Sequence, residues 1–105
     1  MQFQLTKEFI AQLKDRVAAN DGSWILKNVL ELHHADIADI LDELSHKEAK
    51  YVYHLSSEEL QADILMDLQE ENRDRLIESL SVKELADQME YLDIKIQKEK
   101  VYIKS

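Results

Sequence analysis

Acidic side chains at helical spacing are the residues of this chain whose types and positions could do chemistry. Glu59, Asp63 and Asp67 lie at i, i+4 and i+8, so a helix would place them one above another on a single face. A second row, at i, i+3 and i+7, consists of Asp36, Asp39 and Glu43. Like charges four residues apart destabilise a helix by roughly 0.2–0.5 kcal/mol, and a bound cation relieves that repulsion. Mg²⁺ suits such a row because it keeps most of its waters and needs only one or two carboxylates. The alternative is an ordinary solvated helix face.

The other reactive residue types give no catalytic signature. The absence of cysteine excludes a disulfide framework, a thiolate metal site and a cysteine nucleophile, and it fits a cytoplasmic protein. Gly22 is the only glycine, and one glycine cannot form a phosphate-binding loop. The histidines are expected at caps or on the surface, because their spacing does not suggest three or four convergent metal ligands. They are His33, His34, His46 and His54. We therefore predict that the protein is not an enzyme.

The charge is concentrated in the middle of the chain. Residues 34–93 carry 17 acidic and five basic side chains, a net charge of −12 in a chain whose total is −9. This balance opposes binding to nucleic acid or to an anionic membrane and favours cations or basic surfaces. No apolar run approaches the roughly 18 residues of a membrane-spanning helix, and the N-terminus lacks the features of a signal peptide. We expect a soluble chain with no direct membrane insertion.

Regularly spaced leucines and serine caps predict the elements that position these side chains. Three leucines are each followed by a serine that has a glutamate three residues on, the spacing of a capping box. These pairs are Ser45–Glu48, Ser56–Glu59 and Ser81–Glu84. The leucines themselves recur every 11 to 13 residues, at Leu32, Leu44, Leu55, Leu68, Leu80 and Leu92. With no proline, the pattern predicts an all-α array of about seven or eight short helices.

Local signals refine this expectation at both ends of the chain. Thr6 is a predicted cap for the first helix, and Ser23 for the second, after the turn at Asn20-Asp21-Gly22. Hydrophobic spacing predicts that Leu26, Leu41, Leu65 and Met89 are among the core residues. One helical domain is expected over residues 1–93, with residues 94–105 as a divergent basic tail or last helix.

The segment from Leu32 to Leu44 reads L-H-H-A-D-I-A-D-I-L-D-E-L. It resembles the signature L-H-P-A-D-I-A-E-x-L-E-E-L, which opens the cytoplasmic N-terminal domain of MgtE-type magnesium transporters. The leucine-terminated helices behind it continue the repeat of that family in order. The resemblance covers about residues 5–92 and implies a right-handed superhelix of short helices.

The resemblance also implies a function. In the family this domain is an intracellular Mg²⁺ sensor on the cytoplasmic side of the inner membrane, and it precedes CBS domains and the transmembrane domain of a homodimeric transporter. Mg²⁺ bridges its acidic surface to the acidic CBS surface and holds the pore closed. By position in the repeat, Asp63 matches a residue that contacts Mg²⁺, and Glu59 and Asp67 flank it. Binding by this domain alone is expected to be weak, because the site is shared with the partner domain.

Two departures from the family pattern stand out. His34 replaces the usual proline at the first helical position, a change expected to matter little. The stretch Asp93–Glu99 lacks most of the acidic run that carries bridging carboxylates in the family. The chain is expected to be either a fragment of a transporter or a standalone relative. The rival interpretation is a helical protein-interaction module that resembles the middle domain of the flagellar rotor switch protein.

Overall fold

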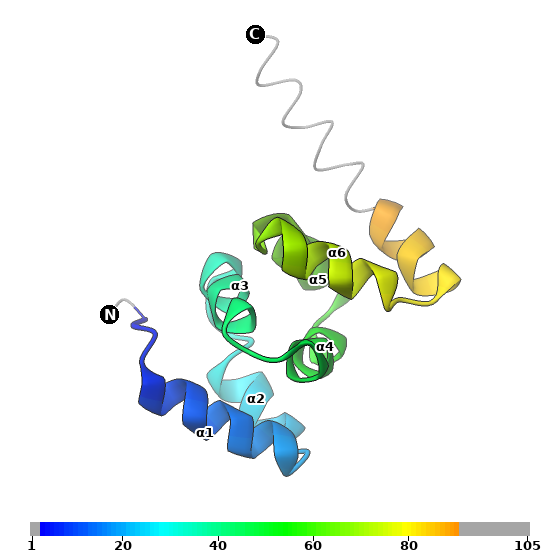
Figure 1. Ribbon diagram of the computed structural model, residues 1–105. Helices are drawn as coiled ribbons and strands as arrows, with labels where there is room; N and C mark the ends of the chain where they lie inside the picture. Colours follow the sequence, from blue (N-terminus) through cyan, green and yellow to red (C-terminus); the bar gives the residue numbers. More distant parts are fainter. Residues whose placement is uncertain (1–2, 91–105) are drawn as a thin grey trace, which may run out of the picture.

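The computed structural model describes residues 3–90, and over that range the chain is helical without a strand (Figure 1). The helices are α1 (Lys7–Ala18), α2 (Gly22–Asn28), α3 (His34–Asp42), α4 (His46–Leu55), α5 (Glu58–Asp67) and α6 (Glu70–Glu78). A further helix covers residues 82–90. The predicted all-α array of about seven short helices is confirmed. The handedness of the superhelix stays a prediction, and the predicted tail at 94–105 lies outside the described residues.

Serine and threonine caps begin several of these helices as the sequence predicts. Thr6 caps α1. Ser45 and Glu48 form a complete capping box, in which the Glu48 N–H donates to Ser45 Oγ at 3.2 Å and the Ser45 N–H donates to Glu48 Oε1 at 2.9 Å. Ser81 and Glu84 repeat this exchange at 3.1 and 3.3 Å. Each box satisfies two amides that a helix start leaves without an intrahelical acceptor.

The predicted capping box Ser56–Glu59 is wrong, because the neighbouring serine takes the role. The hydroxyl of Ser57 accepts the Leu60 N–H at 3.3 Å and so caps α5. Ser56 is buried instead, and its hydroxyl donates to the Val52 carbonyl oxygen at 3.2 Å at the end of α4. With two serines in succession, the one on the solvent side of the connection is free to reach the first turn of the next helix.

The cap of α2 also differs from the prediction. Asp21, not Ser23, holds the start of this helix, and its Oδ1 accepts the Trp24 N–H at 3.2 Å. Arg16 Nη1 donates to the other carboxylate oxygen at 3.0 Å, which ties the end of α1 to the same residue. Asn20 supplies the reversal with a φ of 55°, a left-handed conformation that asparagine tolerates better than most residues. The predicted turn is therefore correct, but the N-cap of α2 is Asp21, two residues before the predicted Ser23.

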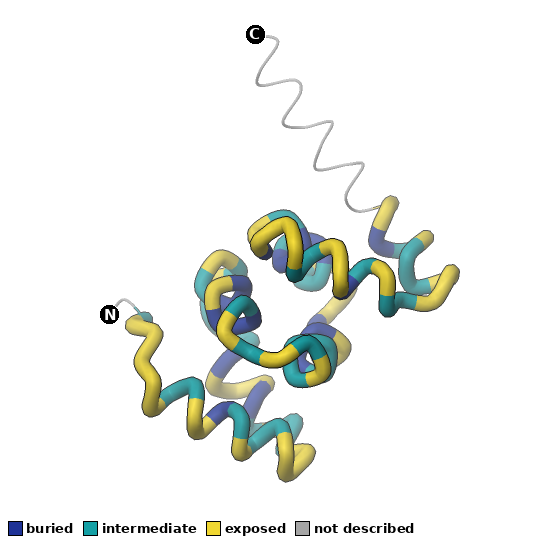
Figure 2. Tube along the Cα trace, viewed as in Figure 1, coloured by how far each residue is buried: buried dark blue, intermediate teal, exposed yellow. Residues whose placement is uncertain are grey.

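The core lies between the helices, and Figure 2 shows its buried positions along their inward sides. The α3–α5 pair forms its centre. Leu41 on α3 is 2% exposed and Leu65 on α5 is 1% exposed, which confirms both predicted core positions. Their buried neighbours on the same two helices are Ile37, Ala38, Ile40, Ala62 and Ile64. Among the described residues, no helix has both the length and the apolar character needed to cross a membrane.

Two predicted core residues are at the surface instead. Leu26 is 48% exposed and Met89 is 51% exposed. In the helix at 82–90 the inward position belongs to Gln88, which is only 2% exposed. Its Nε2 group donates to Gln61 Oε1 at 2.8 Å and to the Glu58 carbonyl oxygen at 3.3 Å. Because these acceptors satisfy the buried amide N–H₂ group, this helix can turn a polar side chain toward the core and leave Met89 outside.

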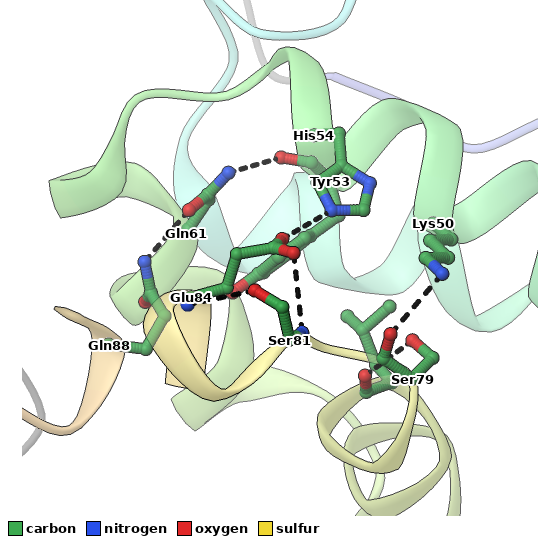
Figure 3. A network of polar contacts seen from close by, with 9 residues as sticks. Lys50, Tyr53, His54, Gln61, Ser79, Ser81, Glu84 and Gln88 are labelled. Carbon is green, nitrogen blue, oxygen red and sulfur yellow. Dashed lines mark hydrogen bonds and ion pairs between the residues drawn. The ribbon is translucent and has the colours of Figure 1, made fainter. Parts of the chain in front are cut away.

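Polar contacts also join the helix at 82–90 to α4 (Figure 3). His54 Nε2 lies 2.7 Å from Glu84 Oε2. Gln61 on α5, which accepts from Gln88, donates in turn to the Tyr53 carbonyl oxygen of α4 at 2.9 Å. Burial raises the pKa of the Tyr53 hydroxyl well above its usual range, and the negative charge of Glu84 raises it further. The His54–Glu84 contact therefore attaches this helix to the end of α4, next to the buried Tyr53.

We expect Leu41→Ala or Leu65→Ala to lower the free energy of unfolding by about 2–5 kcal/mol, since each leaves a cavity in the α3–α5 core. Urea unfolding followed by far-UV circular dichroism measures the change. Leu26→Ala is the matched control, and its effect should be within about 0.5 kcal/mol because the side chain is half in water. Equal losses in all three variants would contradict the described core.

The capping boxes should make stability depend on pH. The His54 imidazole and then the Ser81 hydroxyl and amide lower the pKa of Glu84 below its ordinary value of 4.5. A carboxyl with a lowered folded-state pKa stabilises the fold above the unfolded pKa, and this contribution is lost as the pH falls through the folded pKa. Glu84→Gln should therefore be less stable than wild type near pH 7, and the difference should shrink toward about pH 3. Urea unfolding of both proteins at the two pH values tests this. A stability difference between wild type and Glu84→Gln that is the same at both pH values would contradict the prediction.

Candidate magnesium-binding surface

The predicted acidic row lies on one helix, as expected. Glu59, Asp63 and Asp67 all belong to α5; the first and last are exposed and Asp63 is half-buried. Residues four apart on a helix have Cβ atoms about 5–6 Å from each other, so the row presents neighbouring carboxylates. Within residues 3–90, no three histidine, aspartate or glutamate side chains are grouped so that they could hold a metal ion. The assignment of Mg²⁺ to these three residues stays a prediction.

The second predicted row begins on α3. Asp36 is half-buried in the first turn of that helix, and Asp39 is exposed. Glu43 is the C-cap residue, one position beyond the last helical residue, and it is exposed. Since α3 packs against α5, the two acidic rows belong to one two-helix unit.

A histidine links the two helices of this unit. The Nδ1 atom of His34, the first residue of α3, contacts Asp67 Oδ2 at the end of α5. The neighbouring His33 caps α3, because its Nδ1 accepts the Ala35 N–H at 3.2 Å, and its ring lies 4.2 Å from the His34 ring. The expectation that these histidines act at caps or on the surface is confirmed. The His34–Asp67 contact was not predicted, and a proline at position 34 could not make it.

The far end of α3 fixes the connection that follows the acidic row. Asp42 Oδ1 accepts Asn72 Nδ2–H at 2.7 Å and the Gln69 N–H at 3.4 Å. Gln69 is the N-cap of α6, and its own side chain makes no capping bond. Asp42 therefore supplies an acceptor for the start of α6 from another helix. Sequence spacing gives no signal for such a cap, because the two partners are about 30 residues apart.

Charge is separated between two groups of helices. Within their bounds, α3, α5 and α6 contain 11 acidic and two basic side chains, a net charge of −9. Within their bounds, α1, α2 and α4 contain six lysines and arginines and three acidic side chains, a net charge of +3. The candidate metal ligands thus lie in the acidic group. A concentrated negative field of this kind attracts cations and basic surfaces.

The described residues form a helical array that carries two rows of acidic side chains on α3 and α5. Comparison with protein families gives a match to the MgtE intracellular N domain over residues 32–96. The match covers more than half of the chain, so this chain belongs to the MgtE intracellular N domain family, the intracellular N-terminal domains of magnesium transporters. This family is a transporter family and is not known for enzymes. Comparisons with curated proteins and with solved structures gave no match.

The His34–Asp67 contact can be tested with a double-mutant cycle. His34→Ala and Asp67→Ala should be non-additive, with a coupling energy of about 0.2–1 kcal/mol for a pair that is partly exposed to solvent. Urea unfolding of the wild type, both single variants and the double variant gives this energy. A parallel cycle with His34→Ala and Glu59→Ala is the control, and it should give no coupling. Additive effects for His34 and Asp67 would show that the contact contributes nothing to the fold.

Proposed function

We propose that this domain is the Mg²⁺-responsive regulatory part of a magnesium transporter. In this proposal Glu59, Asp63 and Asp67 contact Mg²⁺ ions that are shared with an acidic surface of CBS domains in the same transporter. The observation that carries the proposal is the concentration of carboxylates on α3, α5 and α6 in a chain of the MgtE intracellular N domain family. The transporter would be a homodimer, with this domain on the cytoplasmic side of the inner membrane.

Electrostatics gives the mechanism. Two acidic surfaces repel each other when no cation lies between them, and a divalent ion at the interface turns that repulsion into attraction. Hydrated Mg²⁺ needs only one or two carboxylates from each surface, which neighbouring side chains on a helix can supply. Contact between the domains then depends on the Mg²⁺ concentration. Closure of the pore is a population shift, set by how much more tightly the closed state binds Mg²⁺ than the open state.

The three proposed ligands are not equivalent. Asp63 occupies the middle of the row and has an acidic neighbour one turn away on each side. Asp67 also contacts His34, so its carboxylate would be shared between the imidazole and the ion. Glu59 is exposed in the first turn of α5, where the helix dipole stabilises its negative charge. Asp63 lies between the other two carboxylates of the row, so it is the position at which we test the proposed cation contact.

Asp63→Ala in an intact transporter that carries this domain should raise the Mg²⁺ concentration needed for closure. The expected change is modest, because total coupling energies are typically about 1–3 kcal/mol and several carboxylates would share them. The measurement is protease protection of the linker to the membrane domain during a Mg²⁺ titration. Asp15→Ala, which removes an exposed aspartate from α1, is the matched control and should leave the curve in place. Identical curves for wild type and Asp63→Ala would remove Asp63 from the mechanism.

The isolated domain should bind Mg²⁺ only weakly, because it offers one of the two surfaces that the proposed site needs. Isothermal titration calorimetry of this chain with MgCl₂ tests the point, and CaCl₂ serves as a comparison for a cation that accepts more protein ligands. Stoichiometric Mg²⁺ binding at submillimolar concentration would overturn the shared-site arrangement.

A further inference from the structure

A groove lies between the end of α1 and helix α4. Its volume is about 570 Å³, in the range of known ligand-binding clefts. The two helices pack against each other, and Figure 1 shows α4 above the C-terminal end of α1. The lining residues from α1 and its C-terminal turn are Val17, Ala18 and Asn20, and those from α4 are Lys47, Glu48, Lys50, Tyr51 and His54.

Basic side chains follow one edge of this groove. Lys47, Lys50 and His54 lie at i, i+3 and i+7 on α4, so they share a helix face. Lys50 Nζ donates to the Ser79 carbonyl oxygen, an uncharged acceptor, at 3.3 Å (Figure 3). The imidazole of His54 contacts Glu84 on its far side. Both lysines line the groove, and Lys47 is the more exposed of the two.

The carboxylate among the lining residues, that of Glu48, is already paired with a lysine. Glu48 Oε1 lies 3.0 Å from Lys14 Nζ, in an ion pair that joins α4 to α1. Burial alone would raise the pKa of Glu48, but hydrogen bonds from the Ser45 amide, the Lys14 ammonium and the Ser45 hydroxyl outweigh it and lower the pKa. Glu48 thus stays ionised and paired, and it does not cancel the charge of Lys47 or Lys50.

The groove also has apolar contact surface. Val17 and Tyr51 are half-buried, and both pack against the hydrophobic core. Ala18, at the end of α1, is exposed and leaves room for a side chain above it. A cationic edge beside an apolar floor is complementary to a segment that carries carboxylates and one apolar or aromatic side chain.

We propose that the groove between α1 and α4 binds a short acidic peptide segment of another protein. Its carboxylates would meet Lys47 and Lys50, and its apolar side chain would lie on Val17 and Tyr51. The segment must be short, because the chain as a whole carries a net charge of −9 and repels extended polyanions. The same repulsion disfavours a second copy of this chain as the occupant. This proposal is independent of the magnesium mechanism, because it uses none of the α5 carboxylates.

The test uses a fluorescein-labelled peptide of six glutamates around one central phenylalanine, titrated with this chain in the absence of Mg²⁺ and followed by fluorescence anisotropy. We expect saturable binding that weakens as salt is added. A peptide in which glutamine replaces every glutamate should not bind. Lys47→Glu should weaken binding by at least about fivefold, because it reverses a charge at the groove. Lys83→Glu makes the same change in net charge on the helix at 82–90 and should alter binding less than about twofold.

A second variant guards against an indirect effect of the charge reversal. Ala18→Glu places a carboxylate on the wall of the groove at an exposed helical position, and it should weaken binding as Lys47→Glu does. Far-UV circular dichroism checks that each variant is folded. The proposal fails if no saturable binding is seen, if the glutamine peptide binds equally well, or if Lys47→Glu and Lys83→Glu have equal effects. If an RNA oligonucleotide competes as strongly as the unlabelled peptide does, the groove binds nucleic acid instead. If the chain sediments as a dimer and Lys47→Glu abolishes the dimer, the groove binds a second copy of the chain.

Discussion

The apolar packing of α3 on α5 is the interaction on which the rest of the structure depends. Ile37 and Leu41 from one helix and Ile64 and Leu65 from the other are buried almost completely, and burial of such side chains is worth roughly 1.5–3 kcal/mol each. This packing leaves the charged sides of both helices at the surface. The acidic rows are thus fixed by a core that holds no charge. The repulsion within each row is small beside the free energy of that core.

Polar contacts then set the position of the neighbouring helices. The His34–Asp67 contact joins the start of α3 to the end of α5, and Asp42 at the end of α3 supplies an acceptor for the start of α6. Farther along the chain, Gln88 and Glu84 attach the helix at 82–90 through hydrogen bonds. Each contact joins residues 27 or more positions apart, so each depends on the array being formed.

The fold was largely predictable from the sequence because most of its signals are local. Capping boxes act over three residues and hydrophobic faces over seven or eight, so Ser45–Glu48 and the Leu41 and Leu65 faces could be predicted correctly. The errors arise where the choice depends on distant partners. Between Ser56 and Ser57 the outcome follows from burial of the first, and Gln88 is buried because Gln61 lies opposite it. The two residues taken wrongly as core, Leu26 and Met89, follow the helical period but face solvent.

The candidate site was predictable only in part. Helical spacing predicted the acidic row on α5, and the structure adds that Asp67 has a partner, His34, on α3. Charge separation between the two groups of helices could not be predicted from the order of residues, because α4 lies between α3 and α5 in the sequence and belongs to the basic group. Most carboxylates of these helices therefore lie on α3, α5 and α6, and most lysines and arginines lie on α1, α2 and α4.

The most direct test of the central claim measures association of this domain with a separately produced pair of CBS domains from a transporter that carries it. Sedimentation velocity in MgCl₂ and in NaCl of equal ionic strength distinguishes an ion bridge from general screening, because screening depends on ionic strength alone. The account predicts that the two proteins associate in MgCl₂ and remain apart in NaCl. Equal association in both salts, or none in either, would contradict a magnesium-bridged contact.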